Sequence, residues 1–177
     1  WDNNKDTYIN NIKDWIDDGA KDMFGNNPVL PNDIPLARGM VVFNSGQTTN
    51  PISRGPNGSV LVPNNLSSVD LWFSVSDDVL TSNQLTHNKI KFSTSLFNFN
   101  SITSYGLNVL NNPISQIGFY SNNEDYFHKY NFDLTSFSSG DVVYFKIYVQ
   151  DDVNPITEIP NNGSPFVLLQ HFSLTII

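Results

Sequence analysis

The amino-acid sequence predicts a mainly β fold, an antiparallel two-sheet sandwich with one N-terminal α-helix, and three observations lead to it. After residue 35, apolar and polar residues alternate in short segments, as they do along half-buried strands. The intervals between these segments are rich in Asn, Gly, Pro and Ser, the residues that turns require. No helical pattern lies between the segments, so nothing in the sequence would cross over a parallel sheet.

The N-terminal segment, residues 6–24, has the apolar spacing of a helix instead. Its apolar residues recur three, four or seven positions apart and would share one face: Tyr8, Ile9, Ile12, Trp15, Ile16 and Met23. Asp6 suits the N-cap position, and Gly25 with the Asn-Asn-Pro that follows would end the helix. The apolar face could pack on the domain that follows, or it could dock on a neighbouring domain or partner. The helix is too short and too acidic for a membrane helix.

Prolines between residues 28 and 35 mark a hinge after this helix. We therefore expect a helix and linker segment over residues 1–27 and a β domain over residues 28–177. The clearest strands cover residues 69–75 and 143–149, where every second residue is Val, Leu, Phe or Ile. Shorter candidate strands cover residues 39–43, 59–62, 89–93, 116–120, 126–134 and 166–176. Seven or more short strands with polar turns favour a sandwich.

Composition limits the classes of function. The net charge is −8 with only 9 Lys and Arg, which argues against binding to a nucleic-acid backbone. No apolar run approaches the roughly 20 residues that a transmembrane helix needs. The absence of Cys excludes disulfides, zinc–thiolate sites and cysteine nucleophiles.

The location is predicted from the same composition. Surface polarity must come largely from 25 Asn, 19 Ser and 10 Thr, a pattern common in exported proteins, although an AT-rich genome would also enrich Asn. The chain begins at Trp1 rather than Met, as a processed or trimmed product would. We expect an extracellular or surface-attached protein whose signal sequence has been removed.

Residues 134–151 carry a family resemblance. They run from Leu134 through Gly140 and Tyr144 to Asp151, and they resemble the E–F corner and F strand of immunoglobulin-like and fibronectin type III-like domains. In those families a Gly-containing turn leads into a strand that bears a Tyr and then alternating apolar residues. Residues 69–78 are similar to the B strand and residues 166–176 to the G strand, so the resemblance covers residues 36–177.

The chain also departs from the family pattern. It has no cysteine pair between the B and F strands, the candidate C strand at residues 89–93 has no Trp, and Tyr144 lies one residue later than usual. The resemblance therefore implies a bacterial immunoglobulin-like surface module. Such modules serve as spacers, adhesins or accessory domains of surface lipoproteins and glycan-handling systems, with a protein or a glycan as the partner.

Two similar phrases, Val-Ser-Asp-Asp-Val and Val-Gln-Asp-Asp-Val, follow the two clearest strands. They place Asp77, Asp78, Asp151 and Asp152 at strand ends. If these strands are B and F of the family topology, the four carboxylates lie at one pole, where Ca²⁺ would relieve their repulsion with its oxygen ligands. The alternative is that each pair ends its strand and faces water separately, because Asp is disfavoured in strands and favoured in turns. The separate-turn interpretation is favoured, so we expect no cofactor, and calcium is the one alternative that the sequence leaves open.

Outward-pointing aromatic residues form the second candidate site. If the inward face of residues 69–75 is apolar, Trp72 points outward, and the same parity points Tyr144 and Tyr148 outward on the other strand. Exposed rings could stack on sugars. The alternative is that these rings are covered, or that they pack against neighbouring strands. If the two strands belong to opposite sheets, Trp72 cannot share a platform with the tyrosines.

Catalytic signals are weak. The chain has 2 Glu, both in predicted loops, and its 3 His are scattered, so each His is better explained as a surface or packing residue. No nucleophile elbow, phosphate loop or zinc-binding helix motif is present. The sequence therefore predicts a non-catalytic module for binding, adhesion or spacing. A carbohydrate-binding module is the alternative, and a hydrolase is the least favoured of the three.

Overall fold

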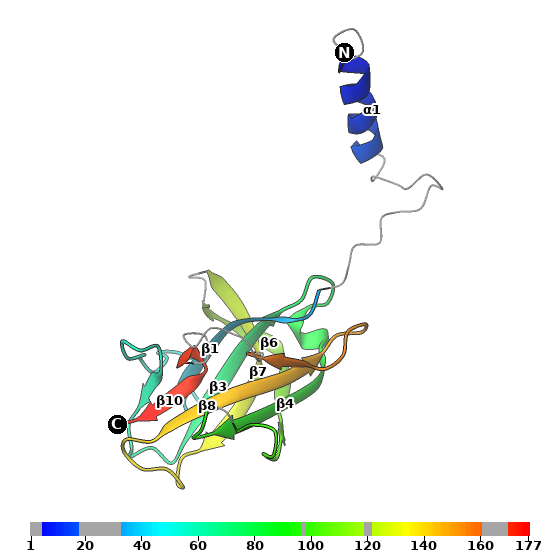
Figure 1. Cartoon of the computed structure of the whole chain (residues 1–177). Helices are drawn as coiled ribbons and strands as arrows, with labels where there is room; N and C mark the ends of the chain where they lie inside the picture. The colour runs from blue at the N-terminus through cyan, green and yellow to red at the C-terminus, as the bar shows by residue number, and fades with distance from the viewer. Residues whose placement is uncertain (1–4, 18–32, 97, 119–121, 161–169) are drawn as a thin grey trace. The chain divides into compact units, whose positions relative to one another are not determined.

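The computed structural model describes residues 5–17, 33–96, 98–118, 122–160 and 170–177. The chain divides into two units, Trp1–Asn32 and Asp33–Ile177. In the first unit, helix α1 spans Lys5–Asp17 (Figure 1). Asp6 therefore lies within the first turn and not at the N-cap position that we predicted. The predicted continuation of the helix over residues 18–24 and the predicted boundary at residue 27 lie outside the described residues.

The apolar stripe of α1 is exposed. More than half of the surface of each of its five apolar side chains is accessible: Tyr8, Ile9, Ile12, Trp15 and Ile16. An isolated helix of 13 residues is marginal in water, because nucleation costs more than so few hydrogen bonds return. Docking of this stripe on its own sandwich or on a neighbouring domain stays a prediction.

The second unit consists of strands, as the sequence predicts. Its longer strands are β1 (Leu36–Asn44), β3 (Ser68–Ser76), β4 (Thr86–Ser93), β6 (Asn108–Ile117), β7 (Asn123–Asp133) and β8 (Val142–Gln150). Its shorter strands are β2 (Val60–Val62), β5 (Tyr105–Gly106), β9 (Thr157–Ile159) and β10 (Ser173–Ile176). One 3₁₀ turn, η2 (Ser82–Gln84), connects β3 to β4.

The strands form two sheets (Figure 1). Sheet A has the order β1-β3-β7-β6, and sheet B has the order β2-β10-β8-β4-β5 with β9 also paired to β8. Among the described strands, all pairs are antiparallel except β2 beside β10, which corrects the prediction of a wholly antiparallel fold. The parallel pair arises because residues 45–59 carry the chain back along the edge of β1 before β2 begins. The backbone N–H of Ile52 donates to Val42 on β1, and that of Leu61 on β2 donates to Ser53.

The two sheets pack face to face around one apolar core. The inward residues of β3 are Val69, Leu71, Phe73 and Val75, and all four are buried in it as their alternation predicts. Phe132 of sheet A packs edge-on against two rings of sheet B, with centroids 4.9 Å from Phe92 and 5.0 Å from Phe145. These contacts across the layers make the second unit a β-sandwich.

Several strands differ from their predicted bounds. Strand β6 begins at Asn108, not at residue 116, because a bulge opposite β7 between Val109 and Ile114 breaks the period of two. Residues 119–120 of that prediction lie outside the described residues. β10 begins at Ser173, and residues 166–169 of the predicted final strand also lie outside the description. The short strands β5 and β9 contain too few residues to show a period.

Candidate functional site

The two Asp pairs lie at the same end of the sandwich. β3 leads through a short connection into β4, whose first residue, Thr86, pairs with Gln150 at the end of β8. The C-terminal ends of β3 and β8 therefore point to the same end of the sandwich. The position of each carboxylate is nevertheless determined by its own turn.

After β3, Asp77 Oδ2 accepts the backbone N–H groups of Val79 at 3.2 Å and Leu80 at 2.7 Å. Asp78 is exposed, and its Oδ2 accepts the backbone N–H of Asp33 at 3.1 Å. The contacts of Asp77 are those of an Asx turn, in which the side chain replaces a backbone acceptor. Asp77 thus closes the loop that leaves sheet A, and Asp78 joins this loop to the segment before β1.

After β8, Asp151 closes a similar turn. Its Oδ1 accepts the backbone N–H groups of Val153 and Asn154, and its Oδ2 accepts the side-chain amide of Asn154 at 2.8 Å. Burial alone would raise the pKa of Asp151, but these hydrogen bonds outweigh it and hold the pKa below its ordinary value. Asp152 is exposed. Among the described residues, no group of three or more His, Asp or Glu side chains is arranged to hold a metal ion. Calcium binding at this pole stays the untested alternative.

Trp72 points outward from sheet A but is covered. Its side chain is 3% exposed and packs with Phe43 and Tyr126 in a second apolar cluster on the outer face of the sheet. The Nζ of Lys129 lies 5.5 Å from the ring centroid. The prediction that Trp72 is an exposed stacking platform is therefore wrong, because neighbouring side chains bury the ring. Its strand also belongs to the sheet opposite β8, so Trp72 cannot share a surface with Tyr144 or Tyr148.

Tyr144 and Tyr148 are half-buried on β8 of sheet B. The Tyr148 hydroxyl donates to Glu158 Oε2 at 3.0 Å, and the Nζ of Lys91 lies 5.1 Å from the ring centroid. Burial and the nearby Glu158 carboxylate raise the pKa of Tyr148. Glu158 also forms an ion pair with Lys146. Tyr148 is therefore part of a polar network, and sugar stacking on Tyr144 or Tyr148 stays a prediction.

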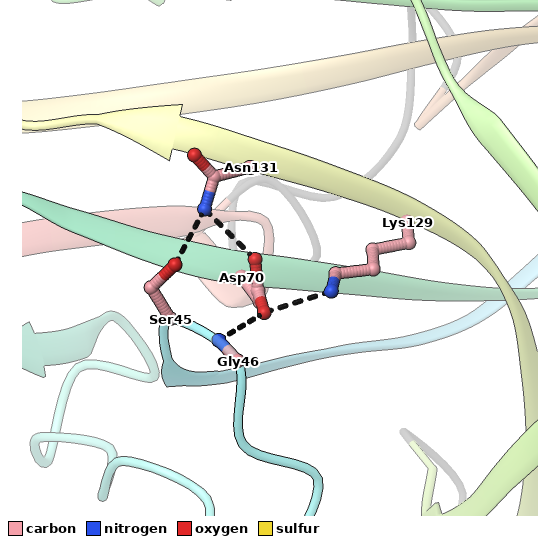
Figure 2. Close-up of polar contacts among 5 residues, drawn as sticks. All are labelled: Ser45, Gly46, Asp70, Lys129 and Asn131. Carbon is pink, nitrogen blue, oxygen red and sulfur yellow. Dashed lines mark hydrogen bonds and ion pairs between the residues drawn. The ribbon is translucent and has the colours of Figure 1, made fainter.

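A buried carboxylate ties β3 to its neighbours on the outer face of sheet A. Figure 2 shows Asp70, which is 1% exposed, receiving Gly46 N–H at 2.7 Å, Lys129 Nζ at 2.8 Å and Asn131 Nδ2 at 2.9 Å. The Asn131 amide also donates to Ser45 Oγ at 2.9 Å. Burial would raise the pKa of Asp70, but these donors outweigh it and lower the pKa. All the described contacts of Asp70 are internal, so its role is structural.

A cavity of about 300 Å³ surrounds Arg54 at one edge of the sandwich. It is lined by residues 39–41 of β1, Arg54, residues 117–118 at the end of β6, Tyr126 and His171. The guanidinium of Arg54 donates to the backbone carbonyls of Met40, Gly58 and His171, the last at 2.9 Å. Arg54 thus joins the edge of β1 to the segments before β2 and β10.

The ionisable groups of this cavity are perturbed. Burial lowers the pKa of Arg54 to about 10, and burial raises the pKa of Tyr126 to about 12. Burial, and then the nearby positive charge of Arg54, lower the pKa of His171. The Tyr126 hydroxyl donates to Ile117 O at 3.2 Å. The cavity therefore holds one cation beside two neutral polar rings, an arrangement that favours an anionic group.

A more open cleft of about 610 Å³ lies where β3 ends against the β6–β7 hairpin. Three carboxylates line it, those of Asp77, Glu124 and Asp125, together with hydroxyls from β3, β6 and Thr81 and the ring of Phe127. Asp77 Oδ1 is buried without a hydrogen-bond partner among the described residues. Hydroxyls and carboxylates beside an aromatic ring can hydrogen-bond and pack against a polar ligand such as a sugar.

Neither concave site follows from the sequence pattern. Arg54, Tyr126 and His171 come from three segments, and one contact between them, from Arg54 to the carbonyl of His171, spans 117 positions. His128, expected as a surface or packing residue, is fully buried in the core. A weak signal for Arg54 existed, since it is a lone cation beside Gly55 and Gly58 in an acidic chain.

Comparisons of the chain with family models, with curated proteins and with solved structures found no match. Within the described residues, no helix combines the length and the apolar character needed to cross a membrane.

Proposed function

We propose that the second unit is an immunoglobulin-like module that acts by non-catalytic binding, adhesion or spacing outside the cell or on its surface. The observation that carries this proposal is the strand order. In immunoglobulin-like domains, one sheet has the order A-B-E-D and the other contains C, F and G. The order β1-β3-β7-β6 corresponds to the first sheet, and the run β10-β8-β4 corresponds to G-F-C.

The contacts of the polar residues support a binding role over a catalytic one. Asp70 joins β3 to β7 and to the turn after β1, whereas Asp77 and Asp151 each close a turn. Carboxylates engaged in this way stabilise a rigid scaffold. Loops and concave edges on such a scaffold are the usual places for a partner. The composition, rich in Asn, Ser and Thr, supports an exported location.

Protease treatment of intact cells that produce this chain tests the location. We expect an added protease to remove the full-length chain, or the chain to be recovered from the medium, while a cytoplasmic marker of the same cells stays intact. Recovery of the undigested chain with the cytoplasmic marker would contradict the proposal. An experimentally determined structure in which β3 and β8 share one sheet would contradict its immunoglobulin-like part.

Carbohydrate binding is the second candidate, and the cleft at the end of β3 favours it. The cleft offers hydroxyl groups of Ser74, Ser76 and Ser115, the carboxylate of Asp125 and the ring of Phe127 within one concave surface. Groups of these kinds hydrogen-bond to sugar hydroxyls and pack on the apolar face of a sugar ring. A hydrolase would need two of the carboxylates of the cleft to act as acid and base or nucleophile.

A glycan array probed with the full chain tests the second candidate. We expect retention on a neutral glycan, weakened by Asp125→Asn and by Phe127→Ala. Asp14→Asn, an exposed carboxylate of α1, is the charge-matched control and should leave retention unchanged. Failure to retain any glycan would contradict this candidate, and release of reducing sugar from the retained glycan would favour a hydrolase.

A further inference from the structure

We infer that the cavity around Arg54 is a binding site for a small organic carboxylate. The first observation is that the guanidinium of Arg54 has no carboxylate partner among the described residues. Lys129 pairs with Asp70 at 2.8 Å, and Lys146 pairs with Glu158, so these cations are neutralised where they are covered. Among the described residues, no carboxylate lies within ion-pair distance of Arg54, although the chain has 17 Asp and Glu. A covered cation without a carboxylate is costly, and a bound anion would remove that cost.

The second observation is a set of unused donors. A guanidinium has five N–H groups. Nη1 donates to the carbonyls of Gly58 and His171, and Nη2 donates to the carbonyl of Met40. Nε–H and one N–H of Nη2 therefore have no acceptor among the described residues. The three carbonyls fix the position of the guanidinium, but they are neutral dipoles and leave its charge for a ligand.

The third observation is the composition of the cavity wall. Apart from Arg54, the described residues of the wall contribute neutral groups, including the aliphatic side chains of Val41 and Ile117 and the hydroxyl of Tyr126. One positive charge matches a carboxylate, whereas a phosphate carries about 1.5 to 2 negative charges at neutral pH. The planar guanidinium also matches the two oxygens of a carboxylate. About 300 Å³ is at the lower end of the range for ligand pockets, so the ligand has only a few carbon atoms.

An NMR titration of the ¹⁵N-labelled full chain with acetate tests this inference. We expect a saturable shift of the Arg54 Nε–Hε resonance and no such shift with acetamide, which has the same shape without the charge. If the guanidinium has only a structural role, acetate leaves that resonance unchanged, and the inference is overturned. A shift with inorganic phosphate but not with acetate would overturn the assignment to carboxylates.

Substitution at Ile117 locates the site without removing Arg54, whose three carbonyl contacts the fold uses. Ile117 lines the cavity, and its side chain is 66% exposed, so a polar residue should be tolerated there. Ile117→Glu supplies a competing carboxylate and should weaken acetate binding at least about tenfold, whereas Ile117→Gln should retain it. Lys89→Gln removes a cation from sheet B and should have no effect. Equal binding by Ile117→Glu and Ile117→Gln, or loss of binding in Lys89→Gln, would place the acetate elsewhere and overturn the inference.

Discussion

His128 should make the stability of the sandwich depend on pH between about 4 and 6.5. The side chain is fully buried on the inner face of β7, where its neighbour in register on β3 is Phe73. Its Nε2 lies 3.0 Å from Asn88 Oδ1 on the opposite sheet. The amide of Asn88 donates to Leu85 O at 2.8 Å, which leaves Oδ1 as an acceptor for the imidazole N–H. His128 is therefore a neutral donor that links the two sheets.

Protonation of His128 would occur at Nδ1, which is buried without a partner among the described residues. A second N–H there would have no acceptor, and the positive charge would have little solvation. Burial accordingly lowers the pKa of His128 from 6.5 to about 4. The unfolded chain binds this proton from about pH 6.5 downwards, so folding stability falls as the pH drops toward 4. A difference of about 2.5 pKa units corresponds to about 3 kcal/mol.

This contribution can be measured by urea denaturation of the wild type and of His128→Gln. Unfolding is followed by circular dichroism at pH values from about 7.5 to about 4. We expect His128→Gln to be the less stable protein at neutral pH and to approach or exceed the wild type at the acid end. The difference in unfolding free energy between the two proteins should change by about 3 kcal/mol over this range. His87→Asn, at an exposed position, is the control, since Asn tolerates the left-handed φ of 49° there. Parallel curves for the wild type and His128→Gln would refute the reasoning.

Three further predictions concern the carboxylates and the edge of sheet A. Asp70→Asn should lower the free energy of unfolding by about 2–4 kcal/mol, because it removes the negative charge that faces Lys129 and places an amide N–H group opposite other donors. A loss below about 0.5 kcal/mol in urea denaturation would contradict this. Gly39→Ala should destabilise the protein, because the added Cβ would lie 2.3 Å from the Tyr126 hydroxyl oxygen. In a Tyr126→Phe background, the loss of unfolding free energy caused by Gly39→Ala should be smaller by at least about 1 kcal/mol. Additive losses in the double variant would count against this clash. The melting temperature of the protein should be the same in excess Ca²⁺ as in a chelator, because Asp77 and Asp151, which follow β3 and β8, already accept backbone N–H groups. A rise of several degrees with Ca²⁺ would favour the calcium hypothesis instead.

Much of the strand pattern was predictable because it is local. The alternation in residues 69–75 and 143–149 depends on burial of one face, and any sheet that buries this face produces the same period. Strand β6 escaped prediction because its bulge and Pro113 disturb the alternation, and the outcome depends on its pairing with β7. The parallel pairing of β2 with β10 likewise joins strands that are more than 100 residues apart in sequence.

The candidate sites show a sharper division between sequence and tertiary structure. The sequence by itself determined that Trp72 points outward, that Asp pairs end two strands, and that the chain is acidic and β-rich. The tertiary structure decided that Trp72 is covered by Phe43 and Tyr126 and that Asp77 and Asp151 close their own turns. It also placed Arg54 in a cavity to which none of the described residues contributes a carboxylate. The physical reason is that the side of the sheet on which a side chain lies follows from its position along the strand. Whether that side chain is buried, and whether a charge is paired, depends on segments that only folding brings together.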